Sequence, residues 1–211
     1  MTKGPAVTRL SLTLAAALIL TPMSGSAADL QDGFDAATKG NYPKAVQEWQ
    51  PLAQAGDALA QFNLAYLYRR GLGVRQNDRT AFDLTRKAAG QGLADAQYQL
   101  AEYYAKAIGT KRDLKQAARW AHLAARQGNS LAAENLPGYQ HALGKAYLSG
   151  DNTYRQHRAK AYMWFTMAAA SGDDKAQTHL TALEKTLSQY RLKKARTAAV
   201  TCQTTDYVTC W

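Results

Sequence analysis

The sequence predicts an all-α fold, a solenoid built from stacked helix-turn-helix repeats. Gly56, Gly92 and Gly128 follow one another at intervals of 36 residues, and segments 57–92 and 93–128 carry similar residue types at matching positions. A fixed period of this length is the sequence signature of stacked repeats. Alanine and leucine dominate the apolar residues, and only five prolines occur in 211 residues. This composition favours helix.

Each regular repeat is predicted to hold two short helices joined by a glycine-containing turn. The first helix carries an apolar stripe with a spacing of four residues, which is Ala60, Leu64 and Tyr68 in one repeat and Ala96, Leu100 and Tyr104 in the next. Asn77 and Asp113 precede the second helices, where a side-chain oxygen can accept from a free backbone N–H. The second helices are expected to bury Ala81, Leu84, Ala88 and Ala89, and then Ala117, Trp120, Ala124 and Ala125.

The repeat pattern divides the chain beyond residue 28 into successive units. The predicted units are 29–56, 57–92, 93–128 and 129–172, followed by a capping helix over 173–196 and a C-terminal tail over 197–211. The first unit begins with an atypical helix, as expected at the end of a solenoid. Its inward-facing residues are predicted to be Phe34 and Ala37 in the first helix, and Ala45, Trp49, Leu52 and Ala53 in the second.

The fourth unit departs from the period because Pro137-Gly138 interrupts its first helix. Leu143 and Tyr147 resume the pattern seven residues late, and the following loop, Asp151 to His157, is one residue longer than its counterparts. One interpretation is a functional insertion on one face of the solenoid. The other is a kinked, lengthened helix from residue 130 to 149. The sequence favours neither.

The C-terminal region is predicted to close the stack. Ala176, Leu180, Leu183, Leu187 and Tyr190 continue an apolar stripe that ends in a basic stretch, and the same segment could alternatively lie on a membrane surface. The two cysteines of the chain, Cys202 and Cys210, are predicted to form a structural disulfide. Metal binding would require more ligands nearby, and a redox pair is usually closer in sequence.

Residues 1–28 have the features of a secretory signal peptide. Lys3 and Arg9 form a basic start, Leu10 to Leu20 is a mainly apolar run of about eleven residues, and Thr21 to Ala28 contains small residues of the kind that precede a cleavage site. A membrane anchor is the alternative, but a membrane-spanning helix needs roughly 20 apolar residues. We therefore expect cleavage after Ala28 and a periplasmic or secreted protein that is not integral to the membrane.

The chain is basic, with a formal net charge of +10, which becomes +8 once Lys3 and Arg9 are removed. A basic surface can attract nucleic acid, acidic proteins or anionic polymers of the cell envelope. Export argues against nucleic acid. The alternative is that the basic residues are ordinary solvated positions on helices.

The repeated phrase AxAQxxLAxxY…G…GVxxD/NxxxA…AAxxG, at Ala58 to Gly92 and Ala94 to Gly128, resembles the Sel-1-like repeat, a relative of the tetratricopeptide repeat. WFTMAAASG at Trp164 to Gly172 fits the same family, and the resemblance covers roughly Phe34 to Arg196. Thr110 departs from it, since valine is expected there. The resemblance implies a right-handed α/α superhelix whose concave face binds other proteins. Exported bacterial members often act as adaptors or regulators in signalling, envelope assembly and host contact.

No pattern in the sequence indicates an enzyme, a cofactor or a metal site. The histidines His122, His141, His157 and His179 show no metal-binding spacing such as HxxxH, and no nucleophile elbow, phosphate loop or dinucleotide fingerprint occurs. His122 is expected to be a structural histidine.

Function is therefore assigned to exposed positions on the first helix of each regular repeat. The candidate partner-binding residues are Asn63, Tyr66, Arg70, Gln99, Glu102 and Lys106. We expect a protein-interaction scaffold or adaptor in the bacterial envelope. The alternatives are a structural binder of an anionic envelope polymer, and ordinary solvated side chains at these positions.

Overall fold

The computed structural model describes residues 29–150 and 153–210. The predicted signal peptide lies outside the described residues, as do Asp151, Asn152 and Trp211. Within the described ranges the chain forms ten α-helices and no strand. They are α1 (Leu30–Thr38), α2 (Tyr42–Ala55), α3 (Ala58–Arg70), α4 (Asp78–Gly90), α5 (Ala94–Lys106), α6 (Leu114–Arg126), α7 (Ser130–Ser149), α8 (Arg158–Ala170), α9 (Ala176–Glu184) and α10 (Gln189–Thr204).

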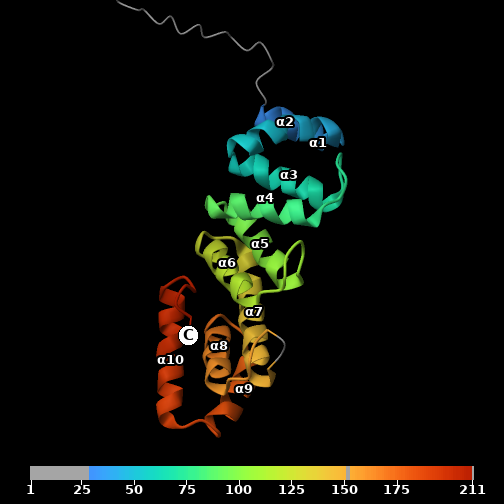
Figure 1. Ribbon diagram of the computed structural model, residues 1–211. Coiled ribbons are helices and arrows are strands. Elements are labelled where there is room, and N and C mark those ends of the chain that lie inside the picture. Colours follow the sequence, from blue (N-terminus) through green and yellow to red (C-terminus); the bar gives the residue numbers. More distant parts are fainter. Residues whose placement is uncertain (1–28, 151–152, 211) are drawn as a thin grey trace, which may run out of the picture.

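The helices stack in chain order into an elongated solenoid (Figure 1). Each helix from α1 to α9 packs on the next, so that antiparallel pairs follow one another along the long axis. Only α10 leaves this order, because it returns along the stack and lies beside α8 (Figure 1). The all-α fold predicted from the repeat period is therefore the observed architecture.

The helix boundaries of the regular repeats follow from capping residues. The side chains of Asp57 and Asn77 accept hydrogen bonds from backbone N–H groups of the first turns of α3 and α4, at 2.7 and 3.0 Å. Asp113 caps α6 in the same way, at 2.9 and 3.1 Å. The predicted roles of Asn77 and Asp113 are thus confirmed. Gly92, at φ 93°, has the left-handed conformation expected at the end of its unit.

Alanines and leucines form the core at the positions that the apolar stripe predicted, but the buried residue in the last turn of each first helix is one position earlier than predicted. Ala60, Ala96, Leu64 and Leu100 are buried, as predicted, whereas the tyrosines at the ends of these stripes are only half-buried. The residues buried in the last turns are instead Leu67 and Tyr103. Residues three and four positions after Leu64 or Leu100 lie on the same side of the helix. Here the residue three positions later faces the neighbouring helix and is the buried one. Leu84, Trp120, Ala125, Leu52, Phe34 and Ala37 are likewise half-buried.

In α1 the buried residues are Gly33 and Ala36, one position before each predicted residue. The Trp49 indole occupies the space where a Gly33 side chain would lie, and its Nε1 donates a hydrogen bond to the Leu30 carbonyl at 3.1 Å. Phe34 packs edge-on against the same indole, with ring centroids 5.3 Å apart. Trp49 therefore joins the atypical first helix to the stack.

Two buried glutamines connect successive repeats. Gln61 donates from Nε2 to the Ala53 carbonyl at 3.1 Å, and its Oε1 accepts from Gln91 Nε2 at 2.9 Å. Gln97 repeats the arrangement with the Ala89 carbonyl and Gln127, at 3.3 and 2.7 Å. Each repeat is thus hydrogen-bonded to its neighbour through side chains as well as packed against it.

Pro137 lies inside α7, which is one helix of 20 residues. Leu143 and Tyr147 are buried, so the resumed pattern is the core-facing part of this helix. The seven additional residues are helical and lie at the N-terminal end of α7. They form no loop on one face. The lengthened-helix interpretation is therefore confirmed for residues 130–149.

The predicted capping helix over 173–196 consists of two helices. The first of them, α9, ends at Glu184, and a new helix, α10, begins at Gln189. Ser188 caps α10 by accepting a hydrogen bond from the Arg191 backbone N–H at 3.4 Å. Leu187 is still buried, but Tyr190 is 74% exposed, because the break changes the helix register. α10 also extends to Thr204, into the segment that was predicted to be a tail. It buries its own stripe against α8, namely Leu192, Ala195, Ala199 and Cys202.

The segment after α10 attaches this helix to the middle of the stack. Cys202 and Cys210 lie at disulfide distance, with Cα atoms 4.6 Å apart, as their spacing predicted. Between them, Tyr207 is buried against the rings of Trp164 and His122, and its hydroxyl accepts a hydrogen bond from Gln140 Nε2.

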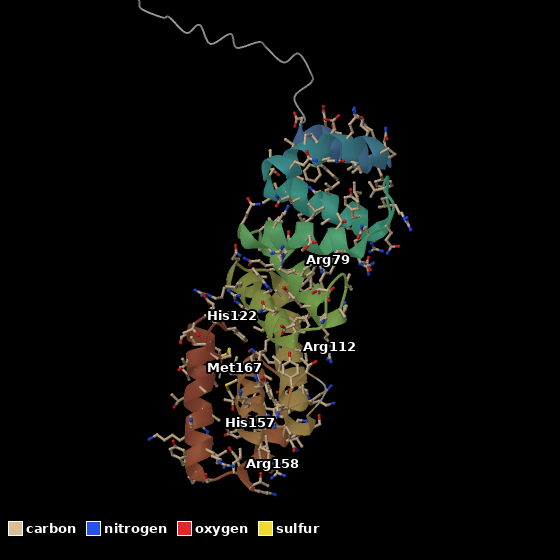
Figure 2. The ribbon with its side chains drawn as sticks, viewed as in Figure 1. Arg79, Arg112, His122, His157, Arg158 and Met167 are labelled. Atoms are coloured by element: carbon tan, nitrogen blue, oxygen red, sulfur yellow. A yellow bond between two sulfur atoms is a disulfide. The ribbon has the colours of Figure 1, made fainter. Side chains whose placement is uncertain are left out.

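Asp206, the neighbour of Tyr207, accepts a hydrogen bond from Arg126 at 2.6 Å and lies 3.3 Å from His122 Nε2. His122 lies near the end of α10 (Figure 2). Burial lowers the pKa of His122, although the Asp206 carboxylate opposes this shift. These contacts give His122 the structural role expected from its position beside core alanines.

Candidate partner-binding pocket

All six candidate binding residues line one pocket, of about 460 Å³, between the first helices of the two regular repeats. Asn63, Tyr66 and Arg70 come from α3, at spacings of three and four residues, so they share one helix face. Gln99, Glu102 and Lys106 occupy the same positions of α5, 36 residues later. Because the repeats stack in register, the two faces lie side by side and form one surface.

Five further residues complete the lining: Phe62, Arg69, Thr85, Tyr103 and Ile108. Phe62 and Arg69 could have been found from the sequence, since they lie four residues before and three residues after Tyr66. Thr85 comes from α4 and Ile108 from the turn after α5, and no spacing argument reaches them. Tyr103 was not predicted because the apolar stripe was assigned to its neighbour, Tyr104.

Charged and aromatic groups occur together in the pocket. Lys106 forms an ion pair with Glu102 at 2.7 Å, and Arg69 forms one with Asp78 at 3.3 Å. The Arg70 guanidinium lies over the Tyr66 ring, 5.7 Å from its centroid, and forms no salt bridge with any carboxylate of the described chain. Tyr66 is 53% exposed. The pocket therefore presents a cation and an aromatic ring to solvent.

Asn63 contributes an amide that has no partner within the protein. Its Nδ2 atom is buried and donates no hydrogen bond to any of the described residues. Leaving such a donor unsatisfied costs about 1–3 kcal/mol. Asn63 lines the pocket, so a rotation of its side chain would allow the amide to donate to an acceptor of a bound partner. Burial raises the pKa of Tyr103, another residue that lines the pocket.

The structure places His141 beside a carboxylate and a second histidine. His141 Nδ1 hydrogen-bonds to the Asp173 carboxylate, and the His141 and His179 rings lie 5.3 Å apart. Within residues 29–150 and 153–210, however, no group of three or more histidine, cysteine, aspartate or glutamate side chains is placed to hold a metal ion. None of the described helices combines the length and the apolar character needed to cross a bilayer.

The solved structures that are similar to the chain include two with helical repeats. One is a Sel1 repeat protein from Oxalobacter formigenes, 27% identical, with a TM-score of 0.46 over 73% of this chain and 58% of that protein. The other is a protective antigen present in uropathogenic Escherichia coli strains and displaying an SLR fold. It is 25% identical, with a TM-score of 0.47 over 82% of this chain and 45% of the antigen. The chain thus spans about half the length of these relatives. No curated protein matches it.

The Sel1 repeat family model matches residues 58–93, 94–129 and 137–173, which together make up more than half of the chain. The first two matches cover α3–α4 and α5–α6. The third begins at Pro137, so the seven residues that lengthen α7 lie between matches. On the strength of these three matched repeats, the chain belongs to the Sel1 repeat family.

Proposed function

We propose that this protein is a non-enzymatic interaction scaffold that binds a partner protein in the pocket between α3 and α5. Sel1 repeat proteins generally mediate protein–protein interactions, and the fold is in general a non-catalytic scaffold. The observation that carries the proposal is the buried Asn63 amide without a partner, in a pocket that also holds an unpaired Arg70. A backbone carbonyl or a carboxylate of the partner would accept from Asn63, and Tyr66 would pack against its side chains.

Replacing Asn63 by alanine distinguishes a binding residue from a structural one. The variant removes a buried, unsatisfied donor, so its melting temperature is expected to equal or exceed that of the wild type. Partner affinity is expected to fall about tenfold, because a hydrogen bond to the partner is lost. Charge reversal of Arg70 and Lys106 together is expected to lower affinity at least as much, without loss of thermal stability.

The partner is first captured in intact cells, with a photo-crosslinking amino acid in place of Tyr66. Affinity for the purified partner is then measured by calorimetry for the wild type, the Asn63→Ala variant and the double charge reversal. Lys44→Glu/Lys87→Glu, which reverses two exposed charges away from the pocket, is the matched control. Unchanged affinity in both pocket variants, or a melting loss like that of a core variant, would contradict the proposal.

We also propose that the protein is exported and acts in the bacterial envelope. Support comes from the signal-like residues 1–28 and from the cysteine pair at disulfide distance, since disulfides persist in oxidising compartments. The protein recovered from the envelope is expected to begin at Asp29 and to lack alkylation at Cys202 and Cys210 until it is reduced. Intact mass measured before and after reduction checks both points. A full-length, fully alkylated cytoplasmic protein would contradict them.

A further inference from the structure

A second hollow surface, which we call the basic groove, lies in the C-terminal half of the solenoid. It consists of two adjoining pockets of about 500 and 480 Å³ that share Gln156 and His157, at the turn leading into α8. No described acidic residue lines either pocket, whereas six lysines and arginines do: Lys115, Arg155, Arg158, Lys160, Arg191 and Lys194. His157 and Arg158 mark its position in Figure 2.

Two lysines from different repeats converge on one ring in this groove. Lys115 of α6 and Lys160 of α8 place their Nζ atoms 5.7 and 5.6 Å from the centroid of the buried Tyr147 ring. Neither forms a salt bridge with a described carboxylate. Burial lowers the pKa of Lys160, and the nearby charge of Lys115 lowers it further. Like charges held this way repel each other, and an anion bound between them would relieve the repulsion.

The second repeat shows that the fold itself does not require cations at the positions of Arg158 and Lys160. The backbone N–H of Asn77 donates to the Tyr68 carbonyl at 2.9 Å, just as that of His157 donates to the Tyr147 carbonyl at 2.7 Å. The two turns therefore correspond in structure. This correspondence aligns Asp78 with Arg158, and Thr80 with Lys160. In the second repeat the Asp78 carboxylate binds Arg69, so the charge at the equivalent position is reversed on a similar backbone.

We propose that the basic groove binds an acidic segment of a partner protein. Carboxylates form charge-assisted, often bidentate hydrogen bonds with arginine, and Arg155, Arg158 and Arg191 line the groove. Tyr190, which is 74% exposed at one end, offers an aromatic surface to the side chains between the carboxylates. The choice of a protein segment over another polyanion rests on the interaction function proposed above. The groove shares no residue with the pocket between α3 and α5.

The test exchanges the groove residues for those of the second repeat. The variant His157→Asn/Arg158→Asp/Lys160→Thr copies Asn77, Asp78 and Thr80, which already form the cap and first turn of a helix of this protein. Binding of a fluorescein-labelled deca-glutamate peptide to the full mature chain is measured by fluorescence anisotropy at low salt. The graft is expected to weaken binding about tenfold, because it removes two cations and adds a carboxylate that repels the peptide. Lys44→Asp/Lys87→Thr, which changes the net charge equally, is expected to alter it less than twofold.

Each outcome decides the proposal. Equal binding by graft and wild type would overturn it, as would equal weakening by the control. Binding of inorganic polyphosphate is measured in the same way. If it binds at least ten times more tightly than the peptide, the proposed ligand is wrong, and the groove binds an anionic polymer. If the graft lowers the melting temperature, Arg158→Gln/Lys160→Gln gives the same comparison with a milder change. Asn63→Ala is expected to leave peptide binding unchanged, which separates failure of the groove from failure of the pocket.

Discussion

Replacing Leu100 by alanine is expected to lower the free energy of unfolding by about 2–5 kcal/mol. The Leu100 side chain is 0% exposed and packs in the cluster that joins α4 to α5, with Ala96, Ala88 and Tyr103. The neighbouring alanines are already short, and they belong to helices that pack against each other. The helices cannot move together without breaking other contacts, so the cavity left by the truncation would persist. Urea denaturation monitored by circular dichroism measures the loss.

The same truncation at an exposed position is the control for Leu100. Leu131, on the additional turns of α7, is 52% exposed, so Leu131→Ala is expected to change stability by less than about 0.5 kcal/mol. Helix propensity changes little in either variant, because leucine and alanine are both strong helix formers. Similar losses at the two sites would show that burial in this cluster does not determine stability.

The period of 36 residues made much of the fold predictable. It predicted a first helix in each regular repeat, which the structure confirms as α3 and α5, and it identified Asn77 and Asp113 as caps from one offset. Helices and their caps depend on residues close in sequence. Because the two regular repeats carry the same local pattern, each feature could be recognised in two places. The exact buried tyrosine was missed because Tyr103 and Tyr104 are adjacent and both fit a helical stripe.

The C-terminal region was not predictable in the same way, because its contacts occur once and span long distances in sequence. The hydrogen bond between Gln140 and Tyr207 crosses 67 residues, and the contact of Arg126 with Asp206 crosses 80. A repeat period cannot predict a contact that occurs only once in the chain. The return of α10 along α8, which breaks the predicted capping helix, depends on these contacts.

The two candidate sites differ in how visible they were in the sequence. Asn63 and Gln99 lie one repeat apart, so their position on one helix face followed from the period, and the structure places them in one pocket, although both are half-buried and not exposed as predicted. The lysines of the basic groove lie 45 residues apart, at Lys115 and Lys160. Their convergence on Tyr147 depends on how α6, α7 and α8 stack, including the lengthened α7. Overall charge indicated that a basic surface exists but not where.

Replacing Gly109 by alanine is expected to cost about 3 kcal/mol or more, through two separate physical effects. Gly109 has φ 65°, a left-handed conformation that is unfavourable for a residue with a Cβ atom. A Cβ at this position would also overlap the backbone carbonyl of Asp78 and approach Phe82, at the start of α4. Backbone cannot move aside as a flexible side chain can. The turn after α5 would therefore have to separate from α4, and two repeats would lose their contact.

Gly92 separates the two effects, because it is also left-handed, at φ 93°, but no atom lies within 4 Å of the position of its missing Cβ. Gly92→Ala should therefore cost only the conformational term, about 1 kcal/mol. The difference in unfolding free energy between the two alanine variants measures the close approach of one repeat to the next. Gly73, one period before Gly109, lies against the backbone of Tyr42 and Pro43 in the same way, so Gly73→Ala should resemble Gly109→Ala. If all three variants lost equal stability, the contact between turns and helix starts would contribute nothing, and the repeats would be joined by their helix faces alone.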